Sequence, residues 1–129
     1  MFKIDPRSST PIYQQIVESV KENILKGMIE PGERMPSVRE MAKMMTLNPN
    51  TVQKAYQELE RQKVIVSIRG RGTFISEDYE GKKDQDKMKA LRELFKKGIV
   101  EAHYIGIEKE ELFKMIEDIL KELEGGLES

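Results

Sequence analysis

The segment from Met35 to Ile75 constrains the fold more than any other part of this 129-residue chain. Ser37 and Glu40 form a capping box, which predicts the start of a short helix. Asn48 followed by Pro49 predicts the start of a second, longer helix, because proline is well tolerated at the first helical position. Two strand-like stretches joined by Arg-Gly-Arg-Gly come next. This order predicts two helices separated by a tight turn, followed by a hairpin wing.

Apolar periodicity predicts which face of each helix is buried. The short helix should turn Met41, Ala42 and Met45 inward. The longer helix carries an apolar stripe at helical spacing: Val52, Ala55, Tyr56 and Leu59. Its opposite face holds no large apolar residue: Asn50, Gln53, Lys54, Gln57 and Arg61. An amphipathic helix of this kind is expected to pack on a core and to keep its polar face in solvent.

A further helix is predicted ahead of this segment. Thr10 is the expected cap, Pro11 the expected first helical residue, and Gly27 the expected C-terminal stop. Apolar residues recur every fourth position along it: Ile12, Ile16, Val20 and Ile24. We expect this stripe to share one core with the two helices and the wing.

Composition excludes several kinds of site. The chain is 38% hydrophobic and 35% charged, which is compatible with a folded protein. It has no cysteine and a single histidine, His103, so we expect neither a disulfide nor a usual zinc site, and no cofactor. The chain contains eight methionines, of which Met41, Met44 and Met45 are predicted to fill the core rather than to line a ligand groove.

Several functional classes find no support in the motifs. The carboxylates are scattered along helix faces, and no P-loop, nucleophile elbow or dinucleotide-binding motif is present, so we expect no enzyme. The N-terminus shows no secretory pattern, and no apolar run approaches the roughly 20 residues needed to span a bilayer. A cytoplasmic protein is therefore expected.

Charge is distributed unevenly along the chain. The net charge is only -1, but the stretch from Arg34 to Gly72 has eight basic and three acidic residues, a net charge of +5. From Glu80 onward, ten basic residues meet thirteen acidic ones, a net charge of -3. A basic module and a mildly acidic one therefore share the chain, although chance variation on solvated faces would give the same totals.

The polar face of the longer helix has the chemistry to read base edges. Asn50 and Gln53 can each bond adenine through two hydrogen bonds, and Lys54 can reach guanine or a phosphate. A solvated helix face would contain the same residues, so this face alone does not distinguish a DNA-binding helix from an ordinary solvent-exposed one. Arg69 and Arg71 follow in the wing, where glycines let the backbone approach closely and arginine is favoured in a narrow minor groove. Together these features predict binding to double-stranded DNA.

Arg39 lies in the first turn of the short helix, where a cation opposes the helix dipole. A phosphate or base partner would explain a cation there. An ion pair with Glu40 or Glu58 would explain it equally well.

The C-terminal part is predicted to form a linker over residues 77–86 and two more helices, separated by Ile105-Gly106-Ile107. The first helix carries Met88 and the stripe Leu91, Phe95, Ile99 and Ala102. The second carries Leu112, Ile116, Ile119, Leu120 and Leu123. A lone helical hairpin buries little surface, so a second copy is expected to cover these stripes, and Gly98 would permit a close helix-helix approach there.

These motifs make the sequence resemble the GntR family of bacterial transcription regulators, and its YtrA-type subfamily in particular. The matching pieces are P-I-Y-Q-Q-I from Pro11, P-G-E-R-M-P-S-V-R-E-M-A from Pro31, N-T-V-Q-K-A-Y from Asn50 and G-R-G-T-F-I from Gly70. They extend from Pro11 to Ile75, about half of the chain. The subfamily also has a short two-helix tail.

The resemblance implies a winged helix-turn-helix dimer on a palindromic operator. It implies that Arg39, the start of the longer helix and the wing tip from Gly70 to Gly72 touch DNA. Many family members have arginine where this chain has Pro49, so base reading here must fall on Asn50, Gln53 or Lys54. The tail is implied to dimerise, often in regulators of neighbouring transporter genes. Its roughly fifty residues could not easily enclose a sizeable pocket, so a small-molecule effector is unsupported.

We therefore expect a mainly α protein with a small β hairpin: a winged helix-turn-helix over residues 1–76, and a linker and two-helix dimerisation tail over residues 77–129. The expected DNA contacts are Arg39, Asn48, Asn50, Thr51, Gln53, Lys54, Arg69, Gly70, Arg71, Gly72 and Thr73. The expected dimer contacts are Leu91, Phe95, Gly98, Ile99, Ala102, Leu112, Ile116, Ile119, Leu120 and Leu123. The expected function is sequence-specific transcriptional regulation, as a homodimeric repressor. A winged-helix protein-interaction module without a DNA target is the alternative, because fold does not dictate function.

Overall fold

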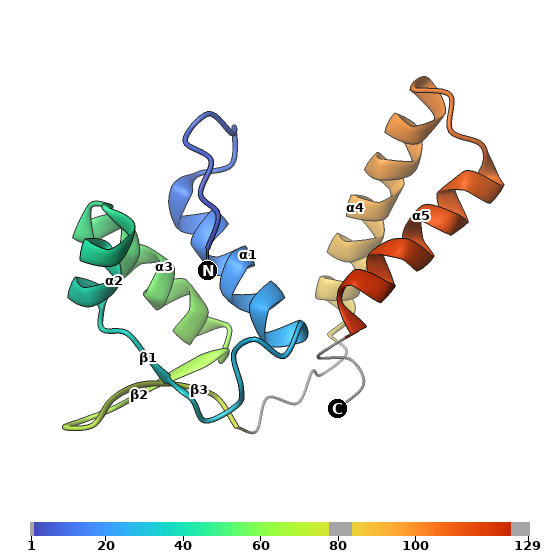
Figure 1. Ribbon diagram of the computed structural model, residues 1–129. Coiled ribbons are helices and arrows are strands. Elements are labelled where there is room, and N and C mark those ends of the chain that lie inside the picture. The colour runs from blue at the N-terminus through green and yellow to red at the C-terminus, as the bar shows by residue number, and fades with distance from the viewer. Residues whose placement is uncertain (1, 78–83, 125–129) are drawn as a thin grey trace. The chain divides into compact units, whose positions relative to one another are not determined.

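The computed structural model describes residues 2–77 and 84–124, which belong to two separate compact units (Figure 1). The elements of the first unit are α1 (Ile12–Leu25), β1 (Arg34–Met35), α2 (Val38–Met45), α3 (Pro49–Arg61), β2 (Ile65–Ile68) and β3 (Gly72–Ile75). Those of the second are α4 (Gln85–Tyr104) and α5 (Lys109–Glu122). The predicted class, mainly helical with a winged helix-turn-helix and a two-helix tail, is confirmed.

Helix α1 begins one residue later than predicted. Pro11 has an extended ψ of 146°, so it is the N-cap itself rather than the first helical residue, and no side chain caps the helix. The predicted cap, Thr10, has a different role, because its carbonyl oxygen accepts a hydrogen bond from Gln15 Nε2 at 2.8 Å. The same Gln15 amide also pairs with the backbone N–H and carbonyl of Asp5, at 2.7 and 2.9 Å. This side chain fastens the N-terminal arm to α1. The end of the helix is as predicted, with Gly27 at a φ of 76°.

The sheet has three strands in the order β1-β3-β2, one more than the predicted hairpin. Strand β2 pairs with β3 in antiparallel register, with Ile65 opposite Ile75. Strand β1 adds to the other side of β3, with Met35 opposite Thr73. A two-residue strand is too short to produce detectable alternation, so only the pairing with β3 reveals β1.

One core joins the helices and the sheet of the first unit. Helices α1, α2 and α3 lie on the same side of the sheet (Figure 1). The fully buried side chains include Ile16, Val20, Met41, Val52 and Leu59. Of the methionines predicted to fill the core, Met45 is only partly buried against it and Met44 is exposed, which corrects that prediction for Met44. Met44 lies on the outer side of α2, three residues after the buried Met41.

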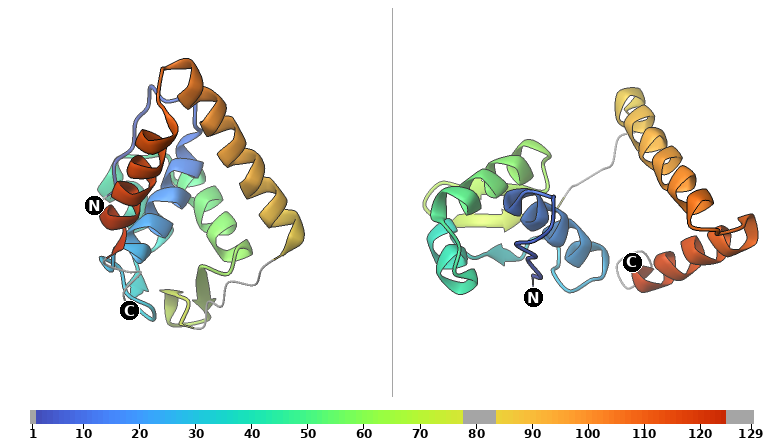
Figure 2. Two further views of the ribbon diagram at one scale, coloured as in Figure 1. Left: turned by 90° about the vertical axis from the view of Figure 1, so that its right-hand side faces the viewer. Right: turned by 90° about the horizontal axis from the view of Figure 1, so that it is seen from above.

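The second unit is an open helical hairpin. Asp84 caps α4 by accepting from the N–H of Asp86 at 2.8 Å, so the helix starts inside the predicted linker, most of which lies outside the described residues. Gly106, at a φ of 83°, ends α4, and the two helices diverge from this corner (Figure 2). Most of the predicted stripe is therefore exposed: Leu91, Phe95, Ile99, Ile116, Ile119 and Leu120. Ala102 is buried, and Leu112 and Leu123 are half-buried.

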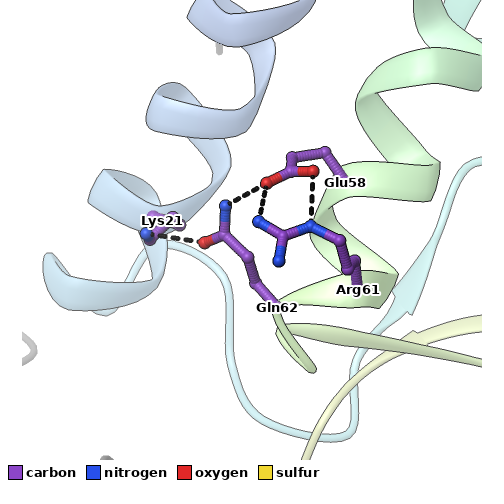
Figure 3. Close-up of polar contacts among 4 residues, drawn as sticks. All are labelled: Lys21, Glu58, Arg61 and Gln62. Carbon is purple, nitrogen blue, oxygen red and sulfur yellow. Dashed lines mark hydrogen bonds and ion pairs between the residues drawn. The ribbon is translucent and has the colours of Figure 1, made fainter. Parts of the chain in front are cut away.

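A chain of polar contacts joins the C-terminal ends of α1 and α3 (Figure 3). Lys21 Nζ donates to Gln62 Oε1 at 2.9 Å, and Gln62 Nε2 donates to Glu58 Oε1 at 2.9 Å. The Arg61 guanidinium bonds both carboxylate oxygens of Glu58. These hydrogen bonds from Arg61 and Gln62 lower the pKa of Glu58 to about 2. The network favours the ionised carboxylate in the folded state.

We expect Glu58→Gln to destabilise the fold near neutral pH and to have less effect in acid. A carboxyl with a lowered folded-state pKa contributes stability above its unfolded value of 4.5, and this contribution is lost as the pH falls towards about 2. Urea unfolding at one protein concentration, followed by circular dichroism at pH 7 and pH 3, measures the difference. Glu60→Gln, an exposed carboxylate on the same helix, is the control for charge loss. A Glu58→Gln effect that is equal at both pH values would contradict the assigned role.

Candidate nucleic-acid interface

Local contacts hold both the start of α2 and the turn that leads from it to α3. At the start of α2, Ser37 Oγ accepts from the N–H of Glu40 at 3.1 Å, and the Glu40 carboxylate accepts from the N–H of Ser37 at 3.2 Å. The helix ends at Thr46, whose φ of 54° is left-handed. Leu47 then donates its N–H back to the Ala42 carbonyl at 2.9 Å and packs partly buried against the core. The predicted capping box is confirmed.

The start of α3 is fixed in the same way. Asn48 Oδ1 accepts from the N–H of Asn50 at 2.8 Å, and Pro49 occupies the first helical position. About two turns further along α3, the Tyr56 hydroxyl donates to the Pro36 carbonyl at 2.6 Å and ties the helix to the segment before α2. Burial raises the pKa of Tyr56 to about 12, so the hydroxyl keeps its proton. These contacts determine the direction of α3 relative to α2.

The outward face of α3 presents polar side chains to solvent. Asn50, Gln53, Lys54 and Gln57 are exposed, and Thr51 is half-buried. The side chains of Asn50 and Gln53 form no hydrogen bond with any other described residue, so their amides are available to an external partner. Asn48 differs, because its carbonyl oxygen is used in the cap and only its Nδ2 remains to donate. Arg61, on the same predicted face, is held by Glu58.

Lys54 has a partner that the sequence did not indicate. Its Nζ lies 4.2 Å from the centroid of the Tyr13 ring, in a cation-π contact between α3 and the first turn of α1. The two residues are 41 positions apart, so no local pattern could have predicted this contact. The contact holds the ammonium group beside the first turn of α1.

Arg39 is exposed and forms no ion pair with any described residue. Both carboxylates that could have neutralised it are occupied elsewhere. Glu40 completes the capping box, whose hydrogen bonds from Ser37 lower its pKa, and Glu58 binds Arg61. The ion-pair explanation for Arg39 is therefore wrong in this structure, and a cation remains exposed on the first turn of α2.

The wing is a tight hairpin whose tip carries two exposed arginines, Arg69 and Arg71. The Ile68 carbonyl accepts from the N–H of Arg71 at 2.9 Å, across a turn in which Gly70 has a φ of 83°. At the base of the tip, Gly72 has a φ of 115°, which L side chains rarely adopt.

Close to the wing tip lies a third arginine that the sequence analysis did not assign. Arg34, on β1, lies against Gly72, where an added Cβ would be 3.2 Å from Arg34 Nε. On the next position of β3, Thr73 Oγ1 lies 3.5 Å from Ser67 Oγ. The position of Arg34 depends on β1, which has no sequence signature, so it could not be placed from the pattern alone.

All eleven predicted DNA contacts lie in the first unit, and all ten predicted dimer contacts lie in the second. Among residues 2–77 and 84–124, no group of three or more histidine, cysteine or acidic side chains could hold a metal ion. Over the same residues, no helix is long and apolar enough to cross a membrane. The side chains that α2, α3 and the wing expose to solvent include amides and guanidinium groups.

A family profile described as "Bacterial regulatory proteins, gntR family" matches residues 12–75. The chain is 50% identical to the HTH-type transcriptional repressor YtrA of Bacillus subtilis, over 98% of this chain and 97% of that protein. The match therefore includes the two-helix tail as well as the winged unit.

Two solved structures show similar folds. A transcriptional antiterminator from Listeria monocytogenes EGD-e is 41% identical with a TM-score of 0.87, over 98% of this chain and 94% of that one. YtrA from Sulfolobus acidocaldarius, described as a GntR-family transcription factor, is 38% identical with a TM-score of 0.60, over 72% of this chain and 96% of that one.

Tyr56→Phe should lower the free energy of unfolding by about 1 kcal/mol, because it leaves the Pro36 carbonyl without its hydrogen bond. Urea unfolding at fixed protein concentration measures the change. Tyr13→Phe is a matched control in the same unit, since the Tyr13 hydroxyl has no hydrogen-bond partner among the described residues and the ring beneath Lys54 is retained. Equal stability of the two variants would show that the Tyr56 hydroxyl does not help to hold α3.

Proposed function

Because the chain belongs to the GntR family of bacterial regulatory proteins, we propose that it represses transcription as a homodimer bound to a palindromic operator. Transcriptional regulation is the family's role, and the similar Bacillus subtilis protein is named a repressor. The observation that carries the proposal is the set of exposed, unpaired donors on α2, α3 and the wing, all within one unit.

Each group of donors suits a different part of DNA. The Asn50 and Gln53 amides can form paired hydrogen bonds with adenine in the major groove, which admits a helix such as α3. Arg39, unpaired on α2, is suited to the phosphate backbone, which positions the protein without reading bases. Arg69 and Arg71 are suited to the minor groove beside the wing, with Gly70 and Gly72 permitting close approach.

The exposed stripes of the second unit support the proposed dimer. Phe95 and Ile99 are 58% and 53% exposed, which is unusual for large apolar residues at helical spacing. A Cβ built on Gly98, between them on α4, would meet nothing within 4 Å, so the glycine leaves room for a helix of another chain. A second copy related by a two-fold axis would cover these residues and would present two reading helices to an inverted repeat.

A protein-interaction module is the competing proposal, and salt dependence distinguishes the two. Binding through phosphate contacts releases counterions, so affinity falls steeply with salt concentration. An interaction surface based on apolar contacts would lack this dependence. The unpaired cations on α2 and the wing favour the DNA proposal.

Gln53→Ala should relax base preference at one position of each half-site and cost roughly 1–3 kcal/mol for the preferred base. Arg71→Ala should instead weaken binding to all sequences and reduce the slope of affinity against salt. Selection from random DNA, followed by binding assays at several salt concentrations, separates these effects.

Arg61→Ala is a suitable control for loss of a cation on α3, since Glu58 already neutralises that guanidinium. If Gln53→Ala and Arg71→Ala both keep wild-type affinity and preference, the assignment of this face to DNA fails. Enrichment of a single, non-repeated half-site would contradict the palindromic operator.

A chain ending at Ser76 should stay folded, because α1, α2, α3 and the sheet share one core. We expect it to be monomeric and to lose most of its operator affinity, because each unit alone makes few DNA contacts. Light scattering and DNA-binding assays test both parts. A truncated protein that remained a tight dimer would move the interface into the winged unit.

A further inference from the structure

The cation-π contact between Lys54 and Tyr13 places the Lys54 ammonium group on the flank of α3 that borders α1. Lys54 Nζ lies 4.2 Å from the centroid of the Tyr13 ring, which belongs to the first turn of α1. Tyr56 is two residues further along α3, about 200° around the helix, and its hydroxyl bonds the Pro36 carbonyl ahead of α2. The exposed face of α3 therefore has α1 along one side and the segment before α2 along the other.

The two amides expected to read bases lie between these flanks. Gln53 is about 100° from Lys54 around the helix, and Asn50 about 40°, both on the side towards Tyr56. Both amide side chains are exposed. A helix in the major groove turns the middle of its exposed face to the base edges, so its flanks face the phosphate backbones. Lys54 thus lies on a flank, where a backbone is the nearer target.

No carboxylate of α3 neutralises the Lys54 ammonium. Glu58 is four residues further along, the spacing of a helical ion pair, but its oxygens bond Arg61 and Gln62 instead. Glu60, the other acidic residue of α3, is about 120° from Lys54 around the helix. None of the ion pairs among the described residues includes Lys54.

The charged groups of α1 and the N-terminal arm do not neutralise it either. The carboxylates nearest to Tyr13 in the sequence are Asp5 and Glu18. The Asp5 carboxylate accepts a hydrogen bond from the N–H of Arg7, and Glu18 is about 140° from Tyr13 around α1. Arg7 is exposed and adds a second positive charge on the arm. The aromatic ring is therefore the partner that holds Lys54, and it leaves the positive charge uncompensated.

We propose that the Tyr13 ring positions the Lys54 ammonium group for a phosphate of the DNA backbone. Lys54 then supplies affinity, while Asn50 and Gln53 supply base preference. This inference rests on the proposed DNA binding and chooses between the two targets, guanine and phosphate, that the sequence left open for Lys54. A lysine stem is flexible, so contact with the ring restricts it before DNA binds and reduces the entropy lost on binding.

Lys54→Ala in the full-length protein tests the target. Binding is measured at several salt concentrations to DNA selected from random sequences and to an unrelated duplex. Affinity for both should fall by the same factor, and the slope of log affinity against log salt should decrease by about 0.9 for each bound protomer, because one phosphate contact is lost. Arg61→Ala is the control and should keep the wild-type slope, since Glu58 neutralises that cation. A changed preference at one base position, or an unchanged slope, would overturn the assignment of Lys54.

The role of the ring is tested by Tyr13→Leu and Tyr13→Phe, each made with Lys54 present and with Lys54→Ala. With Lys54 present, Tyr13→Leu should weaken binding roughly twofold to fivefold for each bound protomer, the effect of an exposed cation-π contact. Tyr13→Phe keeps the ring and should bind like wild type. In the Lys54→Ala background, Tyr13→Leu should have no further effect on affinity. An equal loss in both backgrounds would mean that the ring acts through packing and not through Lys54.

The contact itself can be measured in the wild-type protein, whether or not Tyr13→Leu folds. The ε-methylene protons of Lys54 should show an upfield ring-current shift in NMR spectra, and Tyr13→Phe should preserve that shift. Unshifted protons would contradict the positioning role. A wild-type protein without salt-dependent DNA binding would instead contradict the proposed function, which separates the failure of the two proposals.

Discussion

The complete burial of one face of α3 is the constraint on which the rest of the first unit depends. Val52, Ala55 and Leu59 expose no surface at all. Burying side chains of the size of Val and Leu contributes about 1.5–3 kcal/mol each, whereas an exposed ion pair contributes about 1 kcal/mol or less. Apolar burial therefore decides the rotation of α3, and the polar contacts only refine it. With the helix in that rotation, the side chains of Asn50 and Gln53 lie on its opposite face and are exposed to solvent.

The second unit has the opposite physical character. Its two helices are well formed, and Asp84 caps α4, yet most of their apolar stripes remain in solvent. Secondary structure of this kind is maintained in proteins mainly by tertiary packing of the apolar face. A hairpin that does not close on itself therefore needs another surface to cover these stripes. The proposed dimer rests on this observation.

Much of the candidate DNA interface could be predicted because its determinants are local. The capping box at Ser37, the Asn48-Pro49 start of α3 and the Gly70 turn each depend on residues within a few positions of one another. The contact between Lys54 and Tyr13 could not be predicted, since it depends on how α1 crosses α3. The isolation of Arg39 was also undetermined, because sequence alone left Glu40 and Glu58 as partners and only the structure shows both occupied.

The sequence by itself determined the helices, their buried faces and the order of elements, because capping and apolar periodicity act over a few residues. Only the tertiary structure decided which polar groups are already paired. It also decided that β1 completes the sheet beside Gly72 and that α4 and α5 diverge from each other. These features depend on contacts between residues distant in the chain. Local pattern does not encode such contacts, and burial, strand pairing and charge select them only once the elements meet.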